Sequence, residues 1–167
     1  MDNRYHHKSR WRGKFAINTF FKFVENSNQH IINKLPYSNP FLFVDEILHI
    51  DENGVEGTFT FSEGLDFYKG HFKDNPITPG VLLIETMAQI GLVCLGIYLT
   101  LDDNFTQIAF ISSEIEFLKP VYPNEKVKVV SKKVYFRFGK LKCNVCMLNS
   151  ENVEVCSGTL SGMIINQ

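Results

Sequence analysis

Three side chains in the middle of the sequence have the types and the spacing for acid–base chemistry. His71 carries an imidazole, which titrates near neutral pH and can act as a base. Glu85 follows fourteen residues later in an apolar run, where a carboxyl group stays protonated and can donate a proton. Gln89 lies at i+4 from Glu85 on the same helix face, and we expect it either to support Glu85 or to cap a neighbouring backbone group. The pattern predicts a base and an acid that act on one ligand.

A long helix must position the acid. Residues 81–101 form an apolar run that is too long for a strand. Thr78 is a plausible N-cap and Pro79 suits a first helical turn, so the predicted helix spans about 79–101. This length could cross a bilayer, but the polar residues in its first turns favour a buried core helix.

The start of this helix can itself bind a ligand. Its first backbone N–H groups, that of Gly80 among them, have no partner within the helix. The positive end of the helix dipole points back at the loop that carries His71. We therefore expect this helix end to hold an anion or a developing negative charge.

Strand-like segments lie on both sides of the helix in the sequence. Residues 41–50 and 55–62 flank an Asp-Glu-Asn-Gly sequence, whose Asn-Gly pair favours a tight hairpin. Strand character returns over residues 108–165, with turns at 139–140 and 149–152, and predicts four strands in a row that form a meander. The order of elements disfavours a parallel sheet. It predicts the α+β class, with an antiparallel sheet wrapped around one helix.

Composition and charge limit the class of protein and its partners. The 167 residues are 44% hydrophobic and 21% charged, which predicts one globular domain and excludes disorder for its body. A formal charge of -1 provides no global field for nucleic acid or an anionic membrane, so an electrostatic partner must meet a local patch. We expect neither nucleic acid nor a membrane as a partner. Four cysteines are too few for a disulfide scaffold and fit reduced thiols in a cytoplasm.

Two further features carry less chemistry. Cys143 and Cys146 have an odd separation, which on a strand sends their side chains to opposite faces, so we predict no metal and no cofactor. Residues 1–30 are basic and aromatic, and we interpret them as an amphipathic or disordered arm ahead of a domain at 31–167. This arm lacks the small-residue cleavage site of an exported protein.

Three segments resemble a known family, the (3R)-hydroxyacyl-[acyl-carrier-protein] dehydratases of bacterial fatty-acid synthesis, which have the hot-dog fold. They are LPYSNPFLFVDEI, GHFKDNPITPGVLLIETMAQ and EFLKPVYPNEKV, and the resemblance covers about 35–165. The chain departs from the family pattern at Tyr37, where the family often has His, at Lys73, and at residues 124–125.

The resemblance implies an activity and roles for individual residues. It implies dehydration of 3-hydroxyacyl thioesters on acyl carrier protein to trans-2-enoyl thioesters, in fatty-acid synthesis or a related polyene or polyketide pathway. His71 would be the catalytic histidine, Glu85 the catalytic acid, and the Gly80 N–H would polarise the thioester carbonyl. It further implies homodimers whose sites take His71 from one subunit and Glu85 from the other, and a trimer of dimers stays open.

Other interpretations remain at this point. A hot-dog acyl-thioesterase would use the same groups to activate water at the carbonyl, and a non-catalytic acyl-thioester sensor would bind without reacting. Carrier proteins are acidic, so Lys119, Lys126 and Lys128 are candidates for carrier docking. The seven basic residues of the stretch from Lys126 to Lys142 more often form a solvated strand face.

Overall fold

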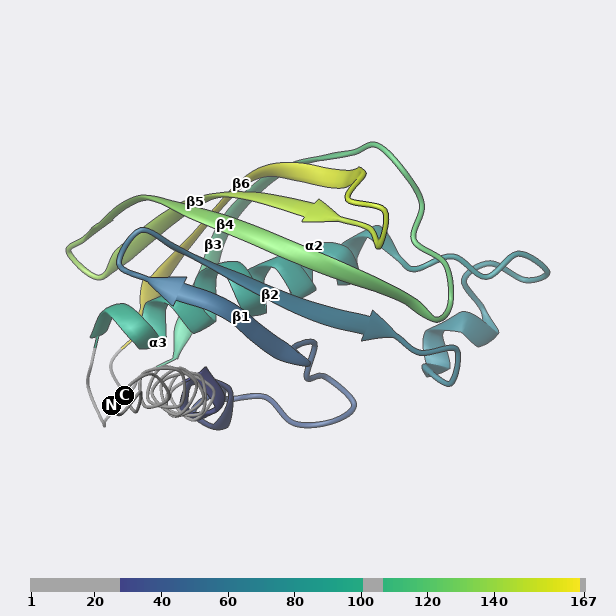
Figure 1. Cartoon of the computed structure of the whole chain (residues 1–167), viewed down its shortest axis with the longest axis horizontal. Helices are drawn as coiled ribbons and strands as arrows, with labels where there is room; N and C mark the ends of the chain where they lie inside the picture. The colour runs from purple at the N-terminus through teal and green to yellow at the C-terminus, as the bar shows by residue number, and fades with distance from the viewer. Residues whose placement is uncertain (1–27, 101–106, 166–167) are drawn as a thin grey trace, which may run out of the picture.

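Six strands form one antiparallel sheet in the computed structural model, which describes residues 28–100 and 107–165. They are β1 (Glu46–Asp51), β2 (Gly54–Phe61), β3 (Ile108–Phe117), β4 (Glu125–Arg137), β5 (Lys140–Leu148) and β6 (Glu154–Ile164). Buried and outward residues alternate on β4 and most clearly on β5, and a central helix runs beneath the sheet (Figure 1). The predicted α+β hot-dog architecture is confirmed.

The central helix consists of three consecutive segments. They are α2 (Gly80–Ala88), the π-helical segment η2 (Gln89–Cys94) and α3 (Leu95–Thr100). The whole helix is long and apolar enough to span a membrane, but 72% of the apolar window is buried within the protein, as predicted for a core helix.

The π-helical segment lies where the helix is closest to the sheet. Every residue of η2 is buried, and the Ser131 hydroxyl of β4 donates to the Gly91 carbonyl at 2.8 Å. A Cβ on Gly91 would lie 3.0 Å from the Ser131 Cβ, so glycine permits this approach. The sequence predicted the close approach but not the π-helical geometry.

The strand order corrects the predicted meander. The order across the sheet is β1-β2-β4-β5-β6-β3, so β3 pairs with β6 and not with β4. The chain reaches β3 only after it has passed beneath the sheet as the central helix, and β3 joins the edge away from β1 (Figure 1). Residues 118–124 then lead back to β4 beside β2. The hydrophobic pattern of the sequence predicts the strands but not the path of the chain from β3 back to β4.

The first predicted strand, at 41–50, is too long. β1 begins only at Glu46, and the backbone at Phe41 and Phe43 bonds instead to a side chain of the helix. The Phe43 N–H donates to Gln89 Oε1 at 2.8 Å, and the Phe41 carbonyl accepts from Gln89 Nε2 at 2.9 Å. A partner this far away in sequence leaves no local signal.

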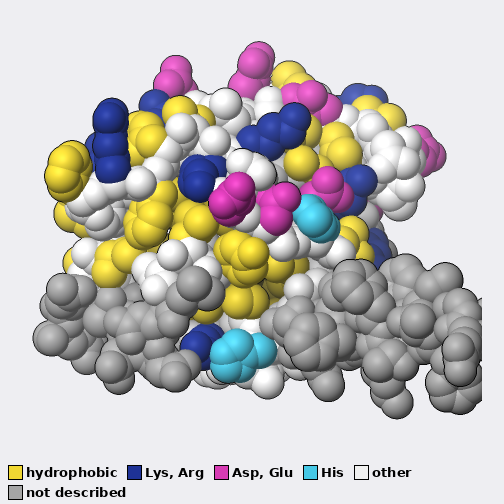
Figure 2. All heavy atoms as spheres, turned by 60° about the vertical axis from the view of Figure 1, so that its left-hand side comes forward, with side chains coloured by type: hydrophobic (Ala, Val, Ile, Leu, Met, Phe, Trp, Pro, Cys, Tyr) yellow, Lys and Arg dark blue, Asp and Glu magenta, His cyan; other side chains and the backbone are white. Residues whose placement is uncertain are grey.

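The first tight turn lies within the predicted Asp-Glu-Asn-Gly sequence, and the second falls one residue earlier than predicted. Glu52 and Asn53 connect β1 to β2, and Phe138 and Gly139 connect β4 to β5. The second turn lies at the end of the molecule that comes forward in Figure 2. The predicted arm at 1–30 lies almost wholly outside the described residues, and the division at residue 30 stays a prediction.

Candidate active site

The central helix begins without a side-chain cap. Its N-cap is Pro79, and Thr78, which the sequence suggested for this role, has other partners. The Thr78 hydroxyl shares a hydrogen bond with the Tyr68 hydroxyl at 2.5 Å, and its N–H donates to the Val121 carbonyl at 2.8 Å. The N–H of Gly80 thus opens the helix with no i−4 acceptor.

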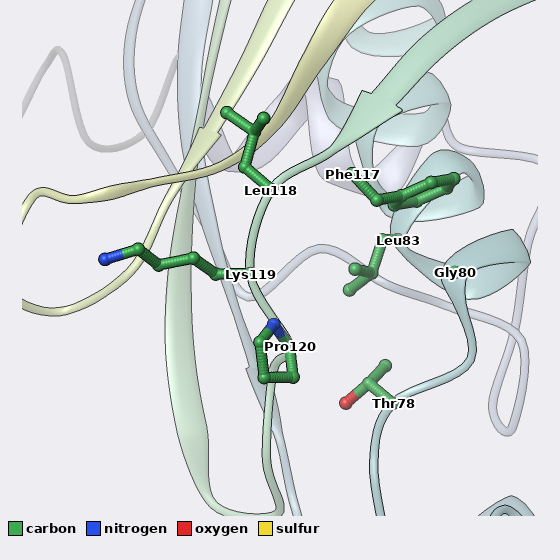
Figure 3. Close-up of a pocket in the computed structure, with 7 residues that line it drawn as sticks. All are labelled: Thr78, Gly80, Leu83, Phe117, Leu118, Lys119 and Pro120. Atoms are coloured by element: carbon green, nitrogen blue, oxygen red, sulfur yellow. The ribbon is translucent and has the colours of Figure 1, made fainter.

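A pocket of about 350 Å³ lies at this helix start (Figure 3). The Phe117 ring points towards the first turn of α2, and a Cβ on Gly80 would lie 3.0 Å from it. Glycine therefore lets an aromatic wall close against the helix N-terminus. The pocket is lined by Thr78, Gly80, Leu83, Phe117, Leu118, Lys119 and Pro120.

Sequence reasoning missed Leu83 and Phe117 as pocket residues. Both are apolar residues inside regular elements, where core packing is the default interpretation. The signal that could have found Phe117 is its place in the EFLKP segment, which belongs to the matched motifs.

His71 lies in the loop between the 3₁₀ helix η1 (Asp66–Lys69) and α2. Its Nδ1 donates to the Ile77 carbonyl at 2.8 Å, and its own carbonyl accepts from the Ile77 N–H at 2.9 Å. A carbonyl only accepts, so the neutral ring carries its proton on Nδ1 and keeps a lone pair on Nε2. The exposed Phe72 ring stacks on the imidazole with centroids 4.1 Å apart. The loop therefore presents an oriented basic nitrogen.

Glu85 is held by the buried side chain of Gln89. Gln89 Nε2 donates to Glu85 Oε1 at 2.8 Å as well as to the Phe41 carbonyl, while Gln89 Oε1 accepts from the Phe43 N–H. Gln89 thus does both things the sequence left open: it supports Glu85 and it satisfies neighbouring backbone. Because Oε1 of Glu85 accepts this hydrogen bond, Oε2 is the oxygen available to a ligand.

Tyr37 is a further residue beside the acid that the sequence did not assign. The pKa of Tyr37 is raised to about 12, chiefly by burial and then by the negative charges of Glu85 and Cys94. Its phenol therefore stays protonated at neutral pH. The available signal was its position in the first matched motif, at a departure from the family pattern.

The described contacts of the single chain do not join His71 to Glu85. The loop that carries His71 projects beyond the end of the sheet, at the right of Figure 1, whereas α2 runs beneath the sheet. A separation within one chain is what a site shared between two chains requires.

The remaining predicted residues lie at the surface or in the core. Lys119 belongs to the pocket rim, but its side chain points away from the pocket (Figure 3). Lys126 and Lys128 lie on the outer face of β4, on either side of the buried Val127.

The cysteines show no sign of a metal site. Cys143 is buried and Cys146 only half-buried, in agreement with opposite faces, and all four cysteines are free. Within residues 28–100 and 107–165, no group of three or more His, Cys, Asp or Glu side chains is placed to hold a metal ion.

Known proteins match both the sequence and the fold. A FabA-like domain matches residues 35–153. The 3-hydroxyacyl-[acyl-carrier-protein] dehydratase FabZ of Roseiflexus castenholzii is 38% identical over 141 residues, which cover 79% of this chain and 92% of the relative. The FabZ dehydratase of Bartonella quintana is 30% identical and covers 82% of this chain and 88% of its own.

Among solved structures, a dehydratase heterocomplex, ApeI:P from Xenorhabdus doucetiae, matches with a TM-score of 0.69 at 13% identity, over 81% of this chain and 91% of its own. A hypothetical thioesterase from Streptococcus pneumoniae, solved with coenzyme A, matches with a TM-score of 0.56 at 17% identity, over 73% and 86%. At these identities the likeness shows the fold alone.

The fold and the arrangement of the site define a hot-dog protein with an oriented base and an oriented carboxyl group. The sequence matches then specify the family. The chain belongs to the FabA-like 3-hydroxyacyl-[acyl-carrier-protein] dehydratases, the family that its motifs predict.

Proposed function

We propose that this chain dehydrates (3R)-3-hydroxyacyl thioesters on acyl carrier protein to trans-2-enoyl thioesters, in fatty-acid synthesis or a related polyene or polyketide pathway. The observation that carries the proposal is a FabA-like domain in which fixed hydrogen bonds orient both His71 and Glu85. Nothing in this proposal depends on a metal or a cofactor.

The chemistry of a 3-hydroxyacyl thioester assigns a role to each group. The C2 proton becomes acidic when the Gly80 N–H stabilises the enolate oxygen, and one such donor contributes about 2.7–4 kcal/mol. Nε2 of His71 removes the C2 proton. Oε2 of Glu85 protonates the C3 hydroxyl, and the C3–O bond breaks to release water. General acid and base catalysis contribute about 10²- to 10⁴-fold each.

The edge of the sheet supports a homodimer with shared sites. β3 is an edge strand, and almost all of its residues are outward or only partly buried. Its Phe110, Ile111 and Phe117 are 47–49% exposed, and an unprotected apolar edge favours pairing with a second sheet. Pairing of two β3 strands would bring a partner chain alongside the pocket. A trimer of dimers stays a prediction, which the mass of the assembly in solution tests.

Two further expectations concern the carrier and the location of the enzyme. Lys119, Lys126 and Lys128 form part of the docking surface for the acidic carrier, so KM for carrier-bound substrate should rise with salt. The enzyme works in the cytoplasm, a location with which its four free thiols agree.

The test uses purified full-length chain and a 3-hydroxyacyl thioester of acyl carrier protein. We expect enoyl thioester formation, and a loss of about 10²- to 10⁴-fold in kcat for His71→Ala and for Glu85→Ala. Normal dehydration by both variants would end the assignment. Release of free thiol by the unaltered protein would favour the thioesterase, and binding without any turnover would favour the sensor.

A further inference from the structure

The turn between β4 and β5 holds an unusual residue for its geometry. Phe138 and Gly139 have φ angles of 53° and 72°, and Arg137 pairs with Lys140 across them, so this is a two-residue hairpin with both central residues left-handed. Such turns favour Asn, Asp or Gly at the first position, because a larger residue with a Cβ is strained there. Phe138 is also 97% exposed. Because its backbone is strained and its side chain is almost fully exposed, Phe138 does not stabilise the isolated fold.

Cations surround this aromatic tip. Arg137 and Lys140 flank it directly, and the Arg137 guanidinium lies 5.0 Å from the centre of the Tyr135 ring on the outer face. No acidic residue occurs between Glu125 and Glu151 in the sequence. The tip therefore has a local positive charge that the net charge of -1 conceals.

Further apolar side chains extend the patch. Met163 lies opposite Lys140 on β6 and is partly exposed, as are Val134 and Ile165. In Figure 2, where this end comes forward, Lys and Arg side chains lie among hydrophobic ones at the upper left, and acidic side chains lie along the upper edge and near the centre. The hairpin-tip patch consists of Val134, Tyr135, Arg137, Phe138, Lys140, Lys142, Met163 and Ile165.

We propose that the hairpin-tip patch docks on an anionic lipid surface, with Phe138 inserted between headgroups and the cations on their phosphates. A projecting aromatic side chain flanked by the cations Arg137 and Lys140 suits a fluid lipid interface, because the aromatic ring needs no preformed pocket there. Charge complementarity selects the lipid class. The sequence predicts no membrane partner, because the net charge gives the protein no global positive field. A local cationic patch can nevertheless attract anionic lipids, and the hairpin-tip patch is such a patch.

Vesicle sedimentation of the full-length protein tests the proposal. We expect binding to phosphatidylcholine vesicles that contain phosphatidylglycerol, little binding to pure phosphatidylcholine, and weaker binding at high salt. Phe138→Asn places a residue that tolerates the left-handed turn, so its melting temperature should not fall. It should nevertheless lower the partition coefficient about fivefold, and the pair Arg137→Gln and Lys140→Gln should lower it at least as much.

Two controls keep the result specific to the patch. The pair Lys126→Gln and Lys128→Gln removes the same charge from the far end of β4 and should leave vesicle binding within about twofold of the unaltered protein. Every variant retains residues 1–27, so binding through that segment would be unchanged by Phe138→Asn. Equal binding by Phe138→Asn, or no binding by the unaltered protein, would overturn the proposal. A rise in KM for carrier-bound substrate with unchanged vesicle binding would also overturn it, in favour of a protein partner.

Discussion

Glu85 and His71 are oriented by two different kinds of structure. Glu85 depends on Gln89, whose amide joins it to backbone groups of Phe41 and Phe43, forty-six to forty-eight residues away in the sequence. His71 depends on Ile77, six residues away in the same loop.

The acid and the base therefore depend on the fold in different ways. The position of Glu85 is coupled to the core, where Gln89 is fully buried. The position of His71 depends on hydrogen bonds within a projecting loop. Changes near the acid should therefore alter stability and rate together, and changes near the base should alter rate alone.

The largest effect in this comparison is expected for Gln89→Met. Methionine has a similar shape but leaves the buried Phe43 N–H without a partner, at about 1–3 kcal/mol, and removes the bond to the Phe41 carbonyl. The melting temperature should fall, and kcat should fall about tenfold because Glu85 loses its orientation. Calorimetry and steady-state kinetics measure both.

The control for this change is Gln29→Met, which makes the same substitution at an exposed glutamine. It should lose less stability than Gln89→Met. An unchanged melting temperature for Gln89→Met would show that the acid is not coupled to the core.

A smaller effect is expected at the base. Phe72→Ala removes the exposed ring that stacks on His71. We expect kcat/KM to fall about threefold through looser positioning, with the free energy of unfolding changed by less than about 0.5 kcal/mol. The same two measurements apply. A large loss of stability would mean that the loop belongs to the core after all.

The smallest effect concerns titration in the core. Burial is the main cause that raises the pKa of Cys143 from 9.0 to about 11. The folded chain therefore keeps the thiol proton at pH values where the unfolded chain has released it. The free energy of unfolding should therefore fall as pH rises from about 9 to about 11. Denaturant unfolding across this range measures the slope, and Cys143→Ala should reduce it. An identical slope in the variant would contradict the assignment.

The sequence predicts those parts of the fold that local pattern controls. The helix at 79–101 agrees with Gly80–Thr100 within the described residues, and the alternation on β5 marks its buried face. His71, Glu85, Gly80 and Gln89 could be selected as candidates because their types and spacing are unusual in an apolar region.

Features that depend on distant contacts could not be predicted. The edge position of β3 follows from the path of the helix, and the hydrogen bond between Ser131 and Gly91 of the π-helical segment joins residues forty positions apart. Tyr37 and Phe117 come to the site only through tertiary packing. Apart from their places in the matched motifs, their local sequence carries no sign of this position.

Subunit mixing tests most directly whether two chains build each site. His71→Ala and Glu85→Ala homodimers are each expected to be nearly inactive. After unfolding and refolding together in equal amounts, half of the dimers are hybrids with one intact site of two, so about a quarter of the unaltered activity should return. Activity that stays at the level of the separate variants, while hybrids form, would contradict a site that takes its histidine and its glutamate from different subunits.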